Sequence, residues 1–220
     1  MANIHLDARL AQAADFVANG SVAADIGCDH GKLACALSYK CSKVIAVDCA
    51  DKPLSRAKEL IARLSINNVE CRLGNGLNAI AEGEAAFIII AGLSAETICD
   101  ILSSCPWAKN DYYTFILIPT TKHNLLRKQL YQNGFCIDEA LAKAAGRIYS
   151  VMRVKYCGKL VHLSDKICAR GFASGDNTAQ YLNIEAGKLL KQALGEDDDT
   201  SRATLAVARY LQTEAKKCQI

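Results

Sequence analysis

The chain has 220 residues, of which 51% are hydrophobic, and its formal net charge is +3 at pH 7. This length and apolar content suffice for one sizeable core with a small appendage. The weakly basic charge permits a nucleic-acid partner but does not argue for one. The sequence has no apolar run of about 18 residues that could cross a membrane, and residues 1–9 lack the apolar core of a signal peptide. We therefore expect a cytoplasmic protein.

The chain contains eleven cysteines, a high number for its length. None of them forms a Cys-x-x-Cys pair, and their closest spacings are too wide for a zinc knuckle. Several lie within apolar segments, among them Cys35, Cys71, Cys99 and Cys136. We interpret them as small buried hydrophobic side chains in a reducing compartment, and we expect no metal site.

Strand patterns alternate with helical patterns over residues 4–156. Residues 4–17 place apolar side chains at helical spacing, and Asn19-Gly20 ends this segment. The run FIIIA at 87–91 has no polar alternation, as expected for a strand buried on both faces. The predicted strands are 22–26, 43–47, 69–73, 87–91, 112–118, 135–141 and 148–156, and the predicted helices are 4–17, 32–39, 53–64, 95–102 and 122–131.

The order of these elements predicts an α/β fold. Repeated strand–helix alternation indicates a parallel sheet with helices on both faces. The last two strands follow each other without a helix, which indicates an antiparallel edge. A mostly parallel seven-stranded sheet with one antiparallel strand is typical of Rossmann-like class I methyltransferases and differs from the all-parallel sheet of dinucleotide dehydrogenases.

The pattern changes beyond about residue 158. Residues 159–175 look irregular, and 177–194 and 201–217 then read as two helices joined by a short acidic loop. Two helices with a short connection predict an antiparallel hairpin. The sequence therefore predicts a sheet domain over 1–158 and a helical, coiled-coil-like extension over 159–220.

Candidate ligand-binding residues follow the first four predicted strands. In an open α/β sheet, ligands bind at the carboxyl ends of the strands, near the point where the strand order reverses. The candidates are Asp25, Gly27 and Gly31 after the first strand, Asp48 after the second, Asn75 and Gly76 after the third, and Ala91 and Gly92 after the fourth.

The turn DIGCDHGKL at 25–33 carries acidic groups, which would repel a pyrophosphate. Glycines let the backbone approach a ligand closely, and an acidic turn attracts the sulfonium and ammonium of S-adenosylmethionine. Asp48 lies about 20 residues after the glycine turn, the distance expected of a ribose-hydroxyl acceptor, and Asn75 could accept a hydrogen bond from adenine. Asp48 could instead only cap the next helix, and Gly76 could be only a turn residue.

The stretch RLAQAADFVANGSVAADIGCDHGKLACAL resembles the start of the bacterial tRNA adenine-22 N1-methyltransferases, the TrmK family. The resemblance continues through VIAVDCADKPLSRAK, LGNGL, FIIIAGLSAETICDIL, ILIPT and GRIYSVMRV, and covers most of residues 4–156 in order. That family has a helical C-terminal extension like the one predicted above.

The resemblance implies a SAM-dependent enzyme that methylates N1 of an adenine in tRNA, with the eight candidates above binding S-adenosylmethionine. It also implies that Asp29, His30 and Arg9 lie near the transferring methyl. Asp29 could stabilise the charge that develops on the base, and His30 could orient Asp29 or only cap the following helix. Arg9 could contact phosphate, pair with an acid of the turn or be an ordinary surface residue. The target base is expected to be extruded from the tRNA, and the protein to act as a monomer or weak homodimer.

The chain departs from the family pattern at three places. Asn75 stands where the family has an acidic residue, Ser94 and Ala95 replace two glycines after the fourth strand, and Ile118 replaces a glutamine. These changes leave open a methyltransferase-like module that holds cofactor or RNA without fast turnover, and a methyltransferase that acts on a small molecule. A dehydrogenase is a more distant alternative, because the turn lacks the GxGxxG spacing.

Overall fold

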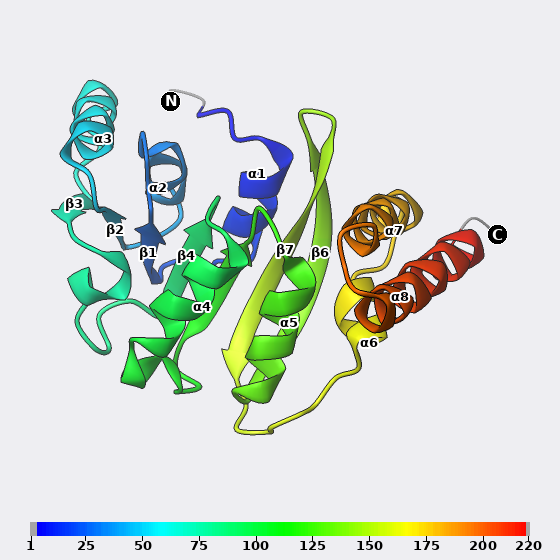
Figure 1. Ribbon diagram of the computed structural model, residues 1–220. Coiled ribbons are helices and arrows are strands. Elements are labelled where there is room, and N and C mark those ends of the chain that lie inside the picture. Colours follow the sequence, from blue (N-terminus) through cyan, green and yellow to red (C-terminus); the bar gives the residue numbers. More distant parts are fainter. Residues whose placement is uncertain (1–3, 219–220) are drawn as a thin grey trace.

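The computed structural model describes residues 4–218, which form an α/β fold around one seven-stranded sheet (Figure 1). The strands are β1 (Val22–Ile26), β2 (Lys43–Asp48), β3 (Val69–Leu73), β4 (Phe87–Ala91), β5 (Thr114–Ile118), β6 (Phe135–Ala144) and β7 (Arg147–Tyr156). The helices are α1 (Ala8–Asp15), α2 (Lys32–Leu37), α3 (Asp51–Arg63), α4 (Ala95–Ser103), α5 (His123–Gln132), α6 (Asp165–Arg170), α7 (Thr178–Ala193) and α8 (Asp198–Lys217), with short 3-10 turns η1 (Gly76–Ala79) and η2 (Pro106–Ala108).

The strand order is β3-β2-β1-β4-β5-β7-β6, which confirms the predicted fold class. Neighbouring strands from β3 to β5 run parallel, and β7 is antiparallel to both β5 and β6. Since β7 reverses direction between them, β5 and β6 point the same way. The turn between β6 and β7, at Ala145 and Gly146, therefore lies at the edge where β1, β4 and β5 have their carboxyl ends.

Helices cover both faces of the sheet, as the unbroken apolar strands require (Figure 1). On one face, α4 and α5 pack through side chains such as Ile98 and Leu126. On the other face, α1, α2 and α3 pack through side chains such as Ala13, Leu33 and Leu54. The two helix layers leave the carboxyl edge of the sheet open between them.

The residue Ser94, where the family resemblance predicted a glycine, has a structural task. Its side chain accepts a hydrogen bond from the backbone N–H of Thr97 at 3.2 Å, and so caps the N-terminus of α4. The next residue, Ala95, is fully buried against the sheet. Ser94 and Ala95 thus stabilise the start of α4.

The C-terminal helices pack beside the β6–β7 hairpin. Helices α7 and α8 pack against each other as the predicted hairpin, and their apolar cluster includes Leu182 and Leu211. Leu141 and Ile148 of the β6–β7 hairpin pack against the same cluster. The prediction that 159–175 is irregular was wrong at Asp165–Arg170, where Ser164 caps the six-residue helix α6 by accepting from the N–H of Ile167.

A buried ion pair ties these helices to the sheet. Arg127 on α5 donates to Glu139 on β6 at 2.5 Å, and neither side chain is exposed to solvent. Arg127 also donates to the hydroxyl of Tyr181 on α7 at 2.7 Å and to the carbonyl of Cys168 on α6 at 2.8 Å. Glu139 accepts a hydrogen bond from the backbone N–H of Phe172 at 2.7 Å. One buried network therefore spans α5, β6 and the C-terminal segment.

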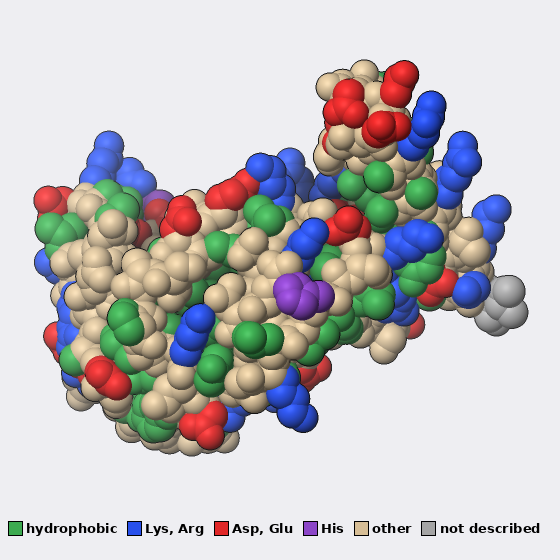
Figure 2. All heavy atoms as spheres, turned by 60° about the horizontal axis from the view of Figure 1, so that its bottom comes forward, with side chains coloured by type: hydrophobic (Ala, Val, Ile, Leu, Met, Phe, Trp, Pro, Cys, Tyr) green, Lys and Arg blue, Asp and Glu red, His purple; other side chains and the backbone are tan. Residues whose placement is uncertain are grey.

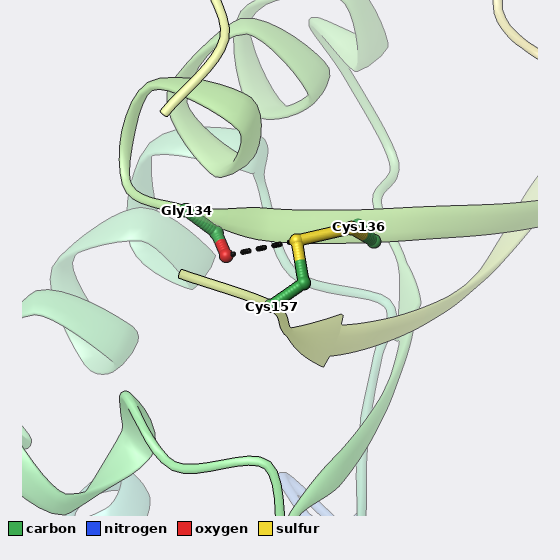
Figure 3. The surroundings of a disulfide bond; sticks show 3 residues. All are labelled: Gly134, Cys136 and Cys157. Atoms are coloured by element: carbon green, nitrogen blue, oxygen red, sulfur yellow. Dashed lines mark hydrogen bonds between the residues drawn. A yellow bond between two sulfur atoms is a disulfide. The ribbon is translucent and has the colours of Figure 1, made fainter. Parts of the chain in front are cut away.

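The interpretation of the cysteines as buried and reduced was wrong for Cys136 and Cys157, which are disulfide-bonded, and for Cys49 and Cys218, which are exposed. Cys136 at the start of β6 is exposed and forms a disulfide with Cys157, just beyond β7 (Figure 3). Their Cα atoms are 6.0 Å apart. The side chains of Cys35 and Cys28 are buried as expected, whereas those of Cys71 and Cys99 are partly exposed. The pairing depends on the hairpin register, which places Cys136 opposite Lys155.

In the part of the chain that the structure describes, no helix is both long and apolar enough to cross a lipid bilayer.

Candidate functional site

A cavity of about 870 Å³ opens at the carboxyl edge of the sheet. Four segments surround it, and each follows or precedes a helix or strand of the sheet domain. The N-terminal segment and α1 contribute His5, Leu6, Asp7, Arg9 and Leu10. Strand β1 and the turn after it contribute Asp25, Gly27, Cys28, Asp29, His30, Lys32 and Leu33. Asp48 and Cys49 come from the end of β2, and Ala91, Gly92 and Leu93 from the end of β4. The cavity thus lies where the strand order predicted a ligand site.

Two glycines of the first turn serve different purposes. Gly27 has a φ of +73°, and a Cβ built on it meets no atom within 4 Å, so its bare backbone faces the cavity. A Cβ on Gly31 would lie 2.8 Å from the Cβ of Ala57 on α3. Gly31 is therefore required by the packing of α2 against α3 and does not line the cavity. Gly92 resembles Gly27, with a φ of +86° and open space around it.

Asp25 is the most unusual acid in the cavity. Its side chain is 3% exposed, and its Oδ2 atom has no hydrogen-bond partner among the described residues. Burial, and more weakly the neighbouring Asp48 carboxylate, raise the pKa of Asp25 to about 7. A buried carboxyl with one unpartnered oxygen that lines a cavity is suited to a cationic ligand, which would supply the missing partner and favour the ionised form.

Asp48 shapes the turn around this cavity. Its Oδ2 accepts a hydrogen bond from the backbone N–H of Asp29 at 3.0 Å, and its Oδ1 accepts one from that of Ala50 at 3.0 Å. Asp48 thus holds the glycine turn and the start of α3 together. A carboxylate oxygen accepts more than one hydrogen bond, so these contacts leave capacity for a ligand hydroxyl.

Asp29 and His30 face each other at the mouth of the cavity. The Nδ1 atom of His30 lies 2.6 Å from Oδ2 of Asp29, as expected if His30 orients the carboxylate. Asp29 adopts a left-handed backbone conformation with a φ of +48°, and its side chain is 68% exposed. The carboxylate is therefore accessible to a substrate, while its backbone is anchored to Asp48.

Arg9 pairs with an acid, although not with one of the turn. Its Nε donates to Asp7 at 3.1 Å, and its guanidinium lies 5.2 Å from the ring centre of Tyr149 on β7. Asp7 also caps α1 by accepting from the N–H of Leu10. Arg9 is thus held at the cavity wall by an acid on one side and an aromatic face on the other.

Asn75 and Gly76 lie outside this cavity. Asn75 is exposed at the end of β3, and a Cβ on Gly76 would lie 3.1 Å from Ile101 of α4. Gly76 therefore has a packing role that accounts for its presence. A cofactor contact for either residue stays a prediction.

The sequence reasoning missed Arg56, Tyr149 and the buried ion pair. Arg56 on α3 lies 2.7 Å from Nε2 of His30, and nothing in the local sequence marks it, because the contact depends on how α2 and α3 pack. Tyr149 lies in the quoted stretch GRIYSVMRV, and its aromatic ring next to a β-turn is a signal that could have identified it as a candidate site residue. Arg127 and Glu139 have no local sequence signature either, because their contact depends on how α5 packs against β6.

A second cavity of about 560 Å³ lies between the start of α5, the β6–β7 turn and α7. Lys122, Arg147 and Lys188 line it, and so does Tyr149. Arg9 of the first cavity lies over the ring of Tyr149, which lines the second, so this contact forms part of the walls of both cavities. Figure 2 shows the helical part projecting from the molecule, with several Lys and Arg side chains along it and acidic side chains at its tip.

Comparison with known proteins places this geometry in a family. Residues 6–152 match the family model described as Methyltransferase domain. The chain is 34% identical over 203 residues to the tRNA (adenine(22)-N(1))-methyltransferase of Bacillus subtilis, and the match covers 90% of this chain and 78% of that protein.

Two solved structures share the fold. The crystal structure of the Streptococcus pneumoniae protein Sp1610 in complex with S-adenosyl-L-methionine has a TM-score of 0.81 at 24% identity, covering 94% of this chain and all of that chain. The crystal structure of the B. subtilis m1A22 tRNA methyltransferase TrmK has a TM-score of 0.73 at 24% identity, covering 98% of this chain and 99% of that chain. The match to the methyltransferase model over most of the chain, together with the identity to the B. subtilis enzyme, shows that this chain belongs to the methyltransferase domain family and, within it, to the family of the tRNA (adenine(22)-N(1))-methyltransferases.

Proposed function

We propose that this protein transfers a methyl group from S-adenosylmethionine to N1 of an adenine in tRNA, at position 22. The single observation that carries the proposal is the acidic, glycine-lined cavity at the carboxyl edge of the sheet, in a chain related to an enzyme named for that reaction. The small-molecule methyltransferase and the inactive module are less well supported, because the relative is a tRNA enzyme and the departures at Ser94 and Ala95 have a structural role.

The cavity fits this cofactor in charge and in shape. Asp25 offers an unpartnered buried oxygen to a cationic group, and the bare backbone at Gly27 and Gly92 allows close approach. Asp48 lies at the end of β2 with room to accept from a ribose hydroxyl. We assign cofactor binding to Asp25, Gly27, Asp48, Ala91 and Gly92.

The cofactor supplies a methyl group bonded to a sulfonium, which is a strong electrophile. The N1 lone pair of the adenine forms the new N–CH₃ bond, and the electrons of the old C–S bond return to sulfur. Positive charge thereby passes to the base. The protein must hold the two reactants in line and stabilise the base as it becomes cationic, so orientation and electrostatics provide the acceleration.

Asp29 is the group placed to stabilise that charge. Its carboxylate is accessible at the mouth of the cavity and lies beside His30. Because the interaction strengthens as charge develops on the base, it lowers the barrier more than it aids substrate binding. Arg9, held near Tyr149, is placed to contact the RNA backbone or the base where the two cavities meet.

The second cavity is the route by which we expect the tRNA to approach. Lys122, Arg147 and Lys188 line it beside Glu185. Lys122 is paired with Glu96 and Lys188 with Glu185, whereas Arg147 has no ion pair among the described residues. Side chains of this kind bind phosphates through a sequence-independent attraction. A base that is extruded from the tRNA could then reach the first cavity past Tyr149. We place the protein in the cytoplasm with its tRNA, acting as a monomer or weak homodimer.

The direct test incubates the full chain with unmodified bacterial tRNA and labelled S-adenosylmethionine, followed by mass analysis of the nucleosides. We expect 1-methyladenosine, mapped to position 22 by digestion of a purified tRNA. Cofactor binding measured by calorimetry without any methylated nucleoside would overturn the enzyme assignment.

Asp29→Ala separates the two roles that a carboxylate at the cavity mouth could have. We expect kcat to fall about 100-fold, because charge stabilisation in the transition state is lost, while the Kd for S-adenosylmethionine changes less than about threefold. Equal losses in both quantities would show that Asp29 is a cofactor ligand instead.

The RNA surface is tested by Arg147→Glu in the full chain. We expect tRNA affinity to fall about tenfold at low salt, since a phosphate contact becomes a repulsion, with cofactor affinity unchanged. Lys159→Glu, beyond the opposite end of β7, is the matched control. An equal effect of both substitutions would indicate a general loss of positive charge and argue against this surface.

A further inference from the structure

A chain of three polar side chains runs from helix α3 to the mouth of the cavity. Arg56 Nη1 lies 2.7 Å from Nε2 of His30, and Nδ1 of His30 lies 2.6 Å from Oδ2 of Asp29. Arg56 does not line the cavity, whereas His30 and Asp29 do. Any influence of Arg56 on a bound substrate therefore passes through His30.

Arg56 fixes which ring nitrogen of His30 carries the proton. A guanidinium is always charged and offers only N–H donors. Nε2 of His30 must therefore be the acceptor of this hydrogen bond, which means that it carries no proton. The single proton of the ring is then on Nδ1 and is donated to Asp29. The geometry selects one tautomer of a neutral imidazole.

The packing of the helices favours this contact between the exposed Arg56 and the half-exposed His30. Gly31 follows His30, and Ala57 follows Arg56. Because Gly31 has no Cβ, α2 approaches α3 so closely that a Cβ there would lie 2.8 Å from Ala57. The two residues that precede this contact, His30 and Arg56, are brought together by the same approach. The Asp29 end of this row of three side chains is fixed as well, since the backbone N–H of Asp29 donates to Asp48.

We propose that Arg56 is a positioning residue for methyl transfer, which holds His30 as the neutral Nδ1–H tautomer so that Asp29 keeps a fixed orientation and its full negative charge toward the substrate. This inference rests on the proposed function. If His30 took up a second proton, an imidazolium in contact with Asp29 would neutralise that carboxylate and weaken its attraction for the cationic base.

The charged and titratable groups around His30 come from several segments. Asp29 and Arg56 contact it directly, and Asp48 holds the backbone of Asp29. Lys32 at the start of α2, together with His5, Asp7 and Arg9 of the N-terminal segment, lines the same cavity. Of these, Arg56 is the group that faces Nε2, the nitrogen at which a second proton would add.

The kinetic test compares Arg56→Met with wild type at pH 8.5. We expect kcat to fall about fivefold, because the imidazole loses the donor that fixes its tautomer and Asp29 loses its fixed orientation. The KM for S-adenosylmethionine should stay within about twofold, and Arg56→Lys should recover much of the loss. Arg63→Met, an exposed arginine on the same helix, is the matched control.

A double-mutant cycle then shows whether Arg56 acts through His30. In a His30→Asn background, Arg56→Met should have almost no further effect on kcat, since the residue that it positions is gone. Additive losses, or an equal loss in Arg63→Met, would each overturn the positioning role.

Nitrogen NMR of the histidine rings tests the same idea without any activity. In wild type at pH 8.5, the His30 ring should carry its proton on Nδ1 and none on Nε2, and in Arg56→Met both tautomers should be populated. If wild type does not methylate tRNA but passes this test, the proposed function fails and the tautomer assignment stands. If it methylates tRNA while its His30 shows the same mixture of tautomers as Arg56→Met, the positioning role fails alone.

Discussion

At the scale of single residues, Asp25 couples the stability of the protein to the ligand that it is placed to bind. The folded protein retains the Asp25 proton up to about pH 7, whereas the unfolded chain loses it near pH 3.8. Since the folded state then binds more protons, the free energy of unfolding falls as the pH rises between these values. The difference corresponds to about 4 kcal/mol, present below pH 4 and lost above pH 7.

Asp25→Asn removes this ionisation while keeping the size of the side chain. We expect the melting temperature of the cofactor-free protein at pH 8 to rise by several degrees, with little change at pH 4.5. The affinity for S-adenosylmethionine should fall about tenfold or more, because a charge-assisted contact is lost. Scanning calorimetry at the two pH values and binding calorimetry at pH 8 measure both effects. A variant that is destabilised equally at both pH values would contradict this account.

Cofactor binding to the wild type should itself depend on pH. A cationic ligand favours the ionised form of Asp25, so binding below about pH 7 must release a proton. We expect the affinity for S-adenosylmethionine to increase as the pH is raised from 6 to 8 and then to level off. Calorimetry in two buffers with different ionisation enthalpies counts the released protons. A proton count of zero at pH 6 would exclude Asp25 as the partner of the ammonium.

At the scale of secondary-structure elements, the Arg127–Glu139 pair joins α5 to β6 and to the helices that follow. Burial alone would raise the pKa of Glu139, but the Arg127 guanidinium lowers it below its usual value. A Cβ on Gly171, whose φ is +72°, would lie 2.6 Å from Arg127. The turn after α6 therefore needs glycine both for its backbone conformation and to admit the guanidinium.

Arg127→Met leaves Glu139 buried without its counterion. We expect the free energy of unfolding to fall by about 3–5 kcal/mol, with faster hydrogen exchange in α6 and α7, which lose their contacts to Arg127. The double variant Arg127→Met/Glu139→Leu should recover part of the loss, because no buried charge remains. Chemical denaturation measures both. A single variant as stable as wild type would show that the pair is not needed for the fold.

The sequence patterns predicted most elements of the sheet domain, because buried parallel strands such as FIIIA and KVIAV are short, nearly continuous apolar runs. They also predicted that Asp25, Gly27, Asp48 and Gly92 would converge, since the carboxyl ends of neighbouring parallel strands share one edge. The place of Asp29 at this edge was implied only by the family resemblance. They did not predict helix α6, which is only six residues long and is marked in the sequence chiefly by its cap, Ser164.

Other features depend on contacts between segments distant in sequence. The disulfide requires the register that brings Cys157 beside Cys136. The Arg56–His30 contact requires the close approach of α2 to α3 at Gly31 and Ala57. Neither feature has a local signature, because the residue types involved are ordinary in their own segments. The position of Asn75 outside the cavity likewise follows from the path of the chain after β3.

At the scale of the whole molecule, the C-terminal helices complete the core of the sheet domain. Tyr181, Phe172 and Cys168 supply partners to the buried ion pair, and Leu141 and Ile148 pack against the apolar cluster of α7 and α8. The boundary near residue 158 that the composition suggested thus separates two segments that share a buried network.

Truncation after residue 158 should therefore damage more than RNA binding. We expect the shortened chain to melt at least 10 °C below the full chain and to aggregate, since Arg127 and Glu139 lose partners and apolar side chains become exposed. Thermal melting and size-exclusion chromatography of both chains test this. A shortened chain that melts at the same temperature and stays monodisperse would establish 1–158 as an independent domain.

The place of β7 between β5 and β6 also has a consequence for synthesis on the ribosome. Strand β5, with the entirely buried sequence TFILI, has no neighbour on one side until Tyr156 has been made. During translation of the intervening residues the nascent chain carries an open, apolar β-edge of the kind that pairs with other chains. This protein should therefore engage chaperones early, and slow translation between codons 118 and 156 should lower its soluble yield.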